Sequence, residues 1–226
     1  PANGIFASQW VGFKYFTQFF SSFQFGTTMF NTLKISLYSI VVGFPLPIIL
    51  AIISNQLRVG KFRKIFQVTT YLPHFISTMV MCGMIILFLS PTSGLLANVF
   101  KSVGITIPDF LSKPSNFAGV YVWSDVWQHI GWDSIIYLAA LSAIDPTYYE
   151  AATMDGASRL QKIRHIELPL LLPTAMILLI LRAGSLLSVG FEKVLLLQNP
   201  LNLAGSEIIS TYVYKVGMVN FQYSYS

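Results

Sequence analysis

Three ionisable residues recur at intervals of four along one apolar stretch of the chain: Asp125, His129 and Asp133. On a helix, this spacing places all three side chains on the same face. Carboxylates accept hydrogen bonds from the hydroxyl groups of a sugar, and a carboxylate beside an imidazole can also serve general acid–base chemistry. Aromatic rings, which can cover the apolar faces of sugar rings, crowd the same stretch at Trp123, Trp127, Trp132 and Tyr137.

The other charges in apolar stretches are few, and each of them needs a partner. An ionisable side chain inside a membrane span costs about 2.5–3.5 kcal/mol, so it usually faces a cavity or a second polar group. Asp133 either lines such a cavity or pairs with Arg182, and both interpretations stay open. Arg182 either lines the path of an acidic sugar or neutralises Asp133 or Glu192, and we favour the ion pair. For Asp125 we favour a place at the outer membrane interface, where aromatic residues gather.

The sequence gives little support for a metal site or for a nucleophilic catalytic residue. No group of His, Cys and carboxylate residues has metal-ligand spacing, and no Ser/His/Asp arrangement stands out, so we expect neither a metal site nor a catalytic residue. The single cysteine, Cys82, excludes an internal disulfide and is predicted to be a small buried side chain. His74 follows a proline near the end of an apolar run and is predicted to pack at the membrane interface.

The composition indicates that lipid surrounds most of the chain. Of its 226 residues, 54% are hydrophobic and only 10% are charged, whereas charged residues make up about a quarter of a typical soluble domain. The formal net charge of +5 does not gather into a basic stripe on a polar domain, so we expect no nucleic-acid partner. We predict a single all-α, polytopic membrane domain over residues 1–226.

Apolar runs of about 20 residues predict where helices cross the membrane. Four spans are predicted, and Pro45 and Pro47 are expected to kink the first of them. The third is weaker because Asp125, His129 and Asp133 interrupt it. The predicted spans cover about 28–54, 72–89, 118–144 and 168–191.

Basic residues between the spans orient the chain, because connections rich in Lys and Arg stay in the cytoplasm. The segment before the first span contains Lys14 as its only charge. The short connection after that span carries Arg58, Lys61, Arg63 and Lys64 and no acid. By alternation the segment 145–167 is also cytoplasmic, and it adds Arg159, Lys162 and Arg164. The two segments agree, and they place the start of the chain outside.

The second cytoplasmic segment, 145–169, begins with a well-marked helix. Asp145 is a good N-cap residue, and Pro146 suits the first helical turn. Gly156 can adopt a left-handed conformation and is expected to end this helix in a bend. The local signals therefore predict a short helix that lies on the cytoplasmic face.

A second short helix is predicted after the bend. Ser158 followed by Gln161 has the sequence of a capping box, and Pro169 is expected to mark the start of the next span. An ordinary amphipathic loop at the membrane interface would show much the same local signals. Local physics alone therefore leaves both interpretations open.

The same segment resembles the EAA loop of binding-protein-dependent ABC transporter permeases, which have a MetI-like transmembrane domain. The resemblance rests on Glu150, Ala151, Ala152, Asp155, Gly156, Ala157, Ile166, Leu168, Pro169 and Pro173. In that family the loop is the coupling helix that docks on a cytoplasmic ATPase subunit. The resemblance implies that Glu150 meets a basic group of the ATPase and that Ala151 and Ala152 permit close packing. Ile163 stands where the family usually has an aromatic residue.

A narrower resemblance covers essentially the whole chain. Several segments look like oligosaccharide and polysaccharide permeases related to the maltose system: Asn31-Thr32-Leu33, Tyr71-Leu72-Pro73-His74, the run from Trp123 to Ala143, Asn199-Pro200, and Thr211-Tyr212-Val213-Tyr214. Such permeases normally have six spans, so the resemblance implies one span before Pro1 and one after Ser226. A sugar would pass between the spans, and the candidate lining residues are Trp127, His129, Asp133, Tyr137 and Arg182.

The family resemblance also implies a set of partners in a bacterial cell membrane. These are a second permease subunit, a dimer of cytoplasmic ATP-binding-cassette ATPases and an external solute-binding protein. The sequence contains no Gly-x-x-x-x-Gly-Lys-Ser/Thr motif, so ATP and Mg²⁺ are expected on the ATPase partner and no cofactor on this chain.

Two other functions use the same polar residues. A membrane-embedded enzyme would take Asp125, His129 and Asp133 as its acid–base set. An ion-coupled secondary transporter would use Asp133 and Arg182. Neither alternative explains the pattern from Glu150 to Pro173.

Overall fold

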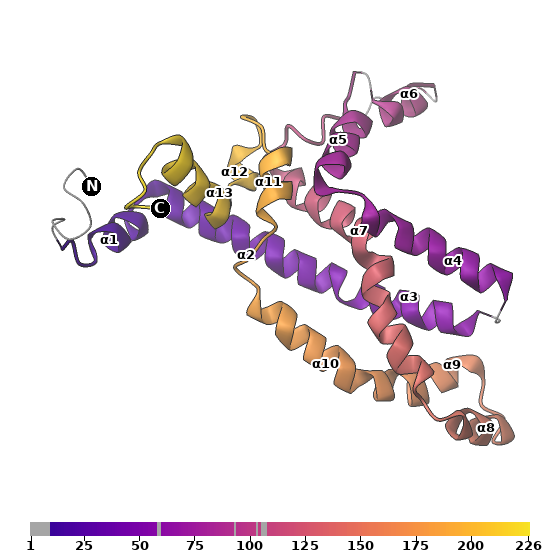
Figure 1. Ribbon diagram of the computed structural model, residues 1–226. Coiled ribbons are helices and arrows are strands. Elements are labelled where there is room, and N and C mark those ends of the chain that lie inside the picture. Colours follow the sequence, from indigo (N-terminus) through magenta and orange to yellow (C-terminus); the bar gives the residue numbers. More distant parts are fainter. Residues whose placement is uncertain (1–9, 58–59, 93, 103, 105–107) are drawn as a thin grey trace.

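The computed structural model describes residues 10–57, 60–92, 94–102, 104 and 108–226, and all regular structure among them is helical (Figure 1). Two helices in this part of the chain are long and apolar enough to cross a membrane, and a bent pair of helices makes a third candidate. The prediction of an all-α polytopic membrane protein is therefore confirmed. Arg58, one of the residues used to orient the chain, lies outside the described residues.

The first predicted span forms one long helix. After a short helix, α1 (Lys14–Phe20), α2 (Phe23–Gly43) and α3 (Pro45–Gln56) join into a helix of 34 residues. The proline pair interrupts this helix only at Phe44, whose backbone keeps right-handed helical torsions. Pro45 is tolerated there because the first residue of a helix needs no N–H partner.

The second predicted span differs from the straight helix expected over 72–89. Helix α4 (Lys61–Tyr71) runs into a 3₁₀ turn, η1 (Leu72–Phe75), and the chain then turns through 97° into α5 (Thr78–Leu89). Ser77 starts α5 as its N-cap, accepting a hydrogen bond from the N–H of Val80 at 3.4 Å. Apolar length alone does not reveal this bend, because the uncharged run continues across it from Val68 to Leu89.

Helix α7 (Pro114–Ser142) is the centre of the molecule. It packs against α2, α3, α4, η1 and α10, and its 29 residues extend about 44 Å at 1.5 Å per residue, which exceeds the hydrocarbon thickness of a bilayer. Helix α6 (Leu95–Ser102) precedes it in the chain. The helix covers most of the range predicted for the third span.

The cytoplasmic segment and the fourth predicted span form two helices that meet at a bend. Two short helices followed by a separate span were expected. Helix α8 (Pro146–Met154) is followed by α9 (Arg159–Lys162), a π-helical turn η2 (Ile163–Glu167) and α10 (Leu168–Gly184). From Arg159 to Gly184 the helix is continuous over 26 residues. The expectation that Pro169 separates a second short helix from the span is therefore corrected. A wide π turn directly before the proline accommodates its missing N–H and its ring.

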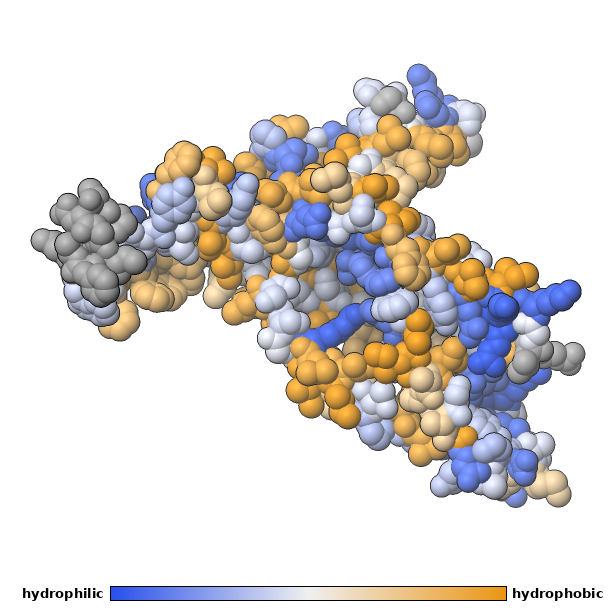
Figure 2. Space-filling model, in the orientation of Figure 1, coloured by the Kyte–Doolittle hydropathy of each residue, from blue (hydrophilic) through white to orange (hydrophobic). Residues whose placement is uncertain are grey.

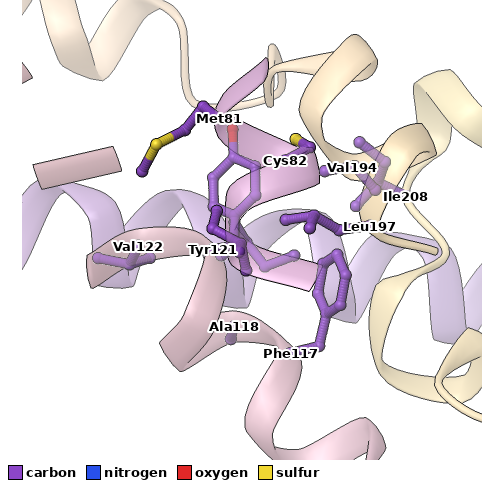
Figure 3. Packing of buried hydrophobic residues seen from close by; sticks show 11 residues of the cluster. Met81, Cys82, Phe117, Ala118, Tyr121, Val122, Val194, Leu197 and Ile208 are labelled. Atoms are coloured by element: carbon purple, nitrogen blue, oxygen red, sulfur yellow. The ribbon is translucent and has the colours of Figure 1, made fainter. Parts of the chain in front are cut away.

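The end of the chain folds back against the middle of α7. Helices α11 (Phe191–Leu197), α12 (Leu203–Ser206) and α13 (Ile209–Tyr214) lead into a second π turn, η3 (Lys215–Val219). Figure 3 shows the apolar core at this junction, to which α5, α7 and α11 each contribute side chains. Cys82 is 1% exposed within this core, which confirms the prediction that it is buried.

Apolar side chains cover much of the outer surface of the spans (Figure 2). On α10, Ile177, Ile180 and Leu181 are each more than half exposed, as expected for a surface that faces lipid. Hydrophilic residues gather at the end of the molecule that carries α8 and α9, and α3 ends and α4 begins on the same side (Figures 1 and 2). Lys61, Arg63 and Lys64 at the start of α4 therefore lie on the side of the second basic segment.

Gly131 on α7 gives a test of this packing. An added Cβ would lie 1.9 Å from the carbonyl oxygen of Thr70 on α4, so only glycine lets the two helices approach this closely. We expect Gly131→Ala to destabilise the protein by about 1–3 kcal/mol, measured as thermal unfolding in detergent. Gly119→Ala on the same helix is the matched control, because no atom lies within 4 Å of its added Cβ. Equal melting temperatures for the two variants would contradict the close approach.

Candidate functional site

Local hydrogen bonds build the start of α8 as the sequence predicts. The Asp145 carboxylate accepts a hydrogen bond from the N–H of Thr147 at 2.9 Å, and Pro146 occupies the first turn. Hydrogen bonding from Thr147 lowers the pKa of the exposed Asp145 carboxyl below its ordinary value. The N-cap prediction is confirmed.

The bend after α8 is a Schellman motif centred on Gly156. This glycine has φ +75°, in the left-handed region that favours glycine. The N–H of Ala157 donates to the carbonyl of Ala152 at 2.8 Å, and that of Gly156 donates to the carbonyl of Thr153 at 3.1 Å. The predicted bend is confirmed, and two carbonyls at the helix end are satisfied by it.

The turn into α9 is also fixed by reciprocal hydrogen bonds. Ser158 accepts from the N–H of Gln161 at 3.4 Å, and the Gln161 side chain accepts from the N–H of Ser158 at 2.7 Å, so the predicted capping box forms. The Lys162 ammonium donates to the Thr153 hydroxyl at 2.7 Å across the bend. This contact ties α8 to α9, so the two helices keep a defined angle.

The residues that carry the EAA resemblance divide into an exposed and a covered set. Glu150, Ala151, Asp155 and Gly156 are exposed, as are Leu168 and Pro169 further along. Ala152, Ala157 and Ile166 are half-buried. Met154 is 89% exposed and Leu160 is 74% exposed, which leaves large apolar side chains next to the exposed carboxylate of Glu150. Such a mixed surface at the end of a membrane protein fits a protein partner.

A buried carboxylate that sequence reasoning missed lies directly behind this surface. Glu167 on η2 is 0% exposed. Its Oε1 accepts hydrogen bonds from Asn55 Nδ2 at 3.1 Å, Gln56 Nε2 at 2.8 Å and Tyr149 Oη at 3.4 Å. Burial and the neighbouring Glu167 raise the pKa of Tyr149 on α8 to about 12. The signal for Glu167 in the sequence is that it is a single acidic residue directly before the pair Leu168 and Pro169.

Inside the membrane region, Asp133 and Arg182 form an ion pair. Nη2 of Arg182 on α10 lies 2.6 Å from Oδ2 of Asp133 on α7, with both side chains partly exposed. The ion pair that the sequence favoured is confirmed, and Glu192, the alternative partner, is exposed at the start of α11. Each charge thereby neutralises the other in a region of low dielectric.

Asp125 belongs to a second charged group and not to the outer interface alone. Its Oδ1 lies 3.2 Å from Nζ of Lys193 on α11 and 3.4 Å from Nδ1 of His129. Lys193 is buried, and its ammonium lies 5.1 Å from the centre of the Tyr121 ring. The interface position favoured for Asp125 is therefore incomplete, because it overlooked Lys193, which follows Glu192 at the start of an apolar run.

Two cavities meet at Arg182. The first has a volume of about 190 Å³ and a polar lining that includes Ser36, Tyr121, Asp125, Arg182 and Ser185. The second has a volume of about 260 Å³ and is lined by Asp133, Tyr137, Arg182 and Ser185 with apolar side chains of α2, α3 and α10. Hydroxyls, two carboxylates and a guanidinium thus converge between α2, α3, α7 and α10. This lining can bind the hydroxyl and carboxylate groups of a sugar.

The structure brings together only part of the predicted lining set. Asp133, Tyr137 and Arg182 share the second cavity, whereas Trp127 and His129 line neither cavity. Trp127 is 52% exposed. Both residues lie away from these two cavities, and their assignment to the substrate path stays a prediction.

His129, besides its contact with Asp125, meets a pair of stacked rings. Its ring lies 5.4 Å from that of His74, which stacks at 4.4 Å and 2° on the ring of Trp132. Gln128, on the same helix, donates to the carbonyl of Ile76 at 2.7 Å. These contacts hold the bend between η1 and α5 against α7. Among the described residues, no group of three or more His, Cys, Asp or Glu side chains is placed to hold a metal ion.

Comparisons with known proteins agree with this geometry. A family model described as "Binding-protein-dependent transport system inner membrane component" matches residues 43–224. The polygalacturonan/rhamnogalacturonan transport system permease protein YteP of Bacillus subtilis is 39% identical over 226 residues, covering 100% of this chain and 70% of the relative. Protein LplB of the same organism is 38% identical over 226 residues, covering 100% of this chain and 71% of the relative.

Solved structures resemble the chain over nearly its whole length. One is the crystal structure of a bacterial ABC transporter involved in the import of the acidic polysaccharide alginate, with a TM-score of 0.93, 41% identity, and coverage of 97% of this chain and 77% of that chain. Another is the bacterial alginate ABC transporter in complex with alginate pentasaccharide-bound periplasmic protein, with a TM-score of 0.92, 41% identity, and coverage of 95% and 75%.

The ion pair between Asp133 and Arg182 can be tested by a double-mutant cycle. We expect Asp133→Asn and Arg182→Gln each to lower the melting temperature in detergent, and the double variant to lose less than the sum. Each single change strands one charge, so the coupling should be about 0.5–3 kcal/mol. Additive losses would mean that the two residues act separately.

A control cycle uses Glu192→Gln with Arg182→Gln. Glu192 is exposed at the start of α11, so additive effects are expected there. Coupling in this control as large as in the Asp133 cycle would point to a general charge effect and not to the observed pair.

Proposed function

The chain belongs to the family of binding-protein-dependent transport system inner membrane components, and from this premise we propose that its sugar path runs past Arg182 and carries acidic oligosaccharides. The protein is the membrane permease subunit of an ATP-binding-cassette importer for sugars. It is a transport component, and a separate cytoplasmic ATPase hydrolyses ATP. A second permease subunit and an external solute-binding protein complete the importer.

The cavities at Arg182 carry the proposal for the path. They lie between α2, α3, α7 and α10, and each combines hydroxyl groups with charged side chains and a tyrosine. Sugar hydroxyls need such donors and acceptors inside a membrane, because water is scarce there. Asp133, Tyr137 and Arg182 are the proposed contacts, joined by Asp125 and Tyr121 in the neighbouring cavity.

The guanidinium of Arg182 supports an acidic substrate. Arg182 presents a planar guanidinium that binds carboxylates through two parallel hydrogen bonds, and its present partner is the carboxylate of Asp133. A uronate carboxylate can bind other N–H groups of this guanidinium while Asp133 keeps its bond to Nη2. The names of two similar proteins, a polygalacturonan/rhamnogalacturonan permease and an alginate importer, point to the same class of sugar.

Coupling to the ATPase is proposed to run through α8 and α9. In support, Glu150 and Met154 are exposed at the cytoplasmic end, and the Gly156 bend and the contact from Lys162 to Thr153 fix the angle between the two helices. Because α9 continues through η2 into α10, a push on this segment is transmitted along one helix. Arg182 lies 23 residues beyond Arg159, about 35 Å along the axis at 1.5 Å per residue. We assign no cofactor to this chain, since ATP and Mg²⁺ belong to the ATPase.

Stimulation of ATP hydrolysis tests the proposed substrate. The complete importer is reconstituted in proteoliposomes with its binding protein and given oligogalacturonate, the same oligosaccharide with its carboxyl groups reduced to alcohols, or a malto-oligosaccharide. We expect the acidic sugar to stimulate hydrolysis most. Equal stimulation by the acid and its reduced form would overturn the acidic preference, and stimulation by none of the sugars would overturn a sugar path.

Gly156→Leu is expected to uncouple transport from ATP hydrolysis. A side chain at φ +75° is strained, so α8 and α9 would meet the ATPase at a different angle. We expect sugar uptake per ATP to fall about tenfold, while expression and membrane insertion survive because no span changes. Gly156→Asn is the matched control, since asparagine tolerates this conformation better. Wild-type uptake by Gly156→Leu would sink the assignment of the bend to coupling.

Glu150→Lys is expected to weaken assembly with the ATPase more than Glu150→Gln. Charge reversal turns attraction to a basic partner into repulsion, whereas the amide keeps the shape and part of the hydrogen bonding. Pull-down of the ATPase by the tagged permease measures the difference. Glu192→Lys, an equal reversal at an exposed position on α11, should retain the ATPase. Equal retention by both Glu150 variants would place Glu150 outside the interface.

A further inference from the structure

The side chain of Glu167 joins three segments that are distant in the sequence. It sits on the π turn η2, and its hydrogen-bond donors are Asn55 and Gln56 at the end of α3 and Tyr149 on α8. All three donors converge on one oxygen, Oε1. The other oxygen, Oε2, is buried and has no hydrogen-bond partner among the described residues.

The π turn explains why Glu167 faces inward. The N–H of Leu168 donates to the carbonyl of Ile163, five residues earlier, so one extra residue is inserted into the helical turn. The residues that flank Glu167 differ from it in burial: Ile166 is half-buried and Leu168 is exposed. The widened turn therefore directs one carboxylate into the contact between α3 and the α8–α9 segment.

Removing this acceptor would take from three half-buried donors the carboxylate that they share. A buried donor that loses its acceptor costs about 1–3 kcal/mol, and here the donors belong to two different helices. Apart from Glu167, α8 is held to α9 by the contact from Lys162 to Thr153, which does not reach α3. Among these polar contacts, the Glu167 cluster connects the α8 segment to the end of the first span.

We propose that Glu167 is a positioning residue that locks the end of α3, the helix α8 and the start of α10 into one unit. A displacement of α8 by the ATPase then moves α3 and α10, two of the helices around the cavities at Arg182, together. The role in coupling rests on the function proposed above, whereas the lock itself is a property of this chain alone.

Distance measurements between spin labels test the lock directly. Labels are attached to cysteines at Ile53 on α3 and Tyr148 on α8, which are 48% and 56% exposed, after Cys82, the one cysteine of the sequence, is removed by Cys82→Ala. In the assembled importer we expect one narrow distance distribution that is the same with and without bound ATP. Glu167→Leu should broaden it. A distribution that changes with ATP in the otherwise unmodified protein, or stays narrow in Glu167→Leu, overturns the lock.

Conservative variants separate positioning from a general loss of stability. Glu167→Gln keeps an acceptor oxygen for the three donors, so we expect it to retain the wild-type ratio of sugar imported to ATP hydrolysed. Glu167→Leu should lower that ratio about tenfold. If Glu167→Gln is uncoupled as strongly as Glu167→Leu, the acceptor role is wrong.

Two neighbouring tyrosines provide a matched pair on α8. Tyr149→Phe removes one donor to Glu167 and should lower the import ratio, whereas Tyr148→Phe removes a hydroxyl from a side chain that is 56% exposed and should not. Equal ratios in the two variants would remove Tyr149 from the lock. If the ATPase fails to assemble with the unaltered chain, the proposed function fails, and the spin-label distances in the isolated subunit still decide on the lock.

Discussion

Charged side chains in a medium of low dielectric must be paired, and this constraint organises the molecule around α7. The helix carries two carboxylates, and a cation from a later segment meets each one: Arg182 on α10 meets Asp133, and Lys193 on α11 meets Asp125. An unpaired charge in a span would cost several kcal/mol. These ion pairs therefore hold α10 and α11 against α7. Members of the pairs line the two cavities.

The same arrangement places the sugar path and the coupling segment on one continuous element. Helix α10 carries Arg182 near its outer end and continues at its other end through η2 into α9. The ATPase side of the molecule is thus linked to the charged cavities by a helix and by the Glu167 cluster on α3. A movement of α8 therefore reaches the ion pair of Asp133 and Arg182 through α10 and through the helices that pack against it.

Local signals in the sequence predicted local structure well. The N-cap Asp145, the bend at Gly156 and the capping box of Ser158 with Gln161 depend on residues within a few positions, and all three are confirmed. The pair of Asp133 with Arg182 was also predictable from the sequence, because each of these charges would be costly in a span without a partner.

Features that depend on distant segments were not predictable in the same way. The partnership of Lys193 with Asp125, the donors around Glu167 and the 97° bend after η1 arise when helices pack. Asp125, His129 and Asp133 share one face of α7, yet only the two carboxylates line the cavities, since His129 lies against Asp125 and His74. Periodicity shows which residues share a face but does not show which helix covers it.

A structure of the assembled importer, trapped with an acidic oligosaccharide in transit, tests the central claim most directly. The account predicts sugar density between α2, α3, α7 and α10, with a uronate carboxylate within hydrogen-bond distance of the Arg182 guanidinium. Sugar density beside Trp127, away from the Arg182 guanidinium, would contradict it.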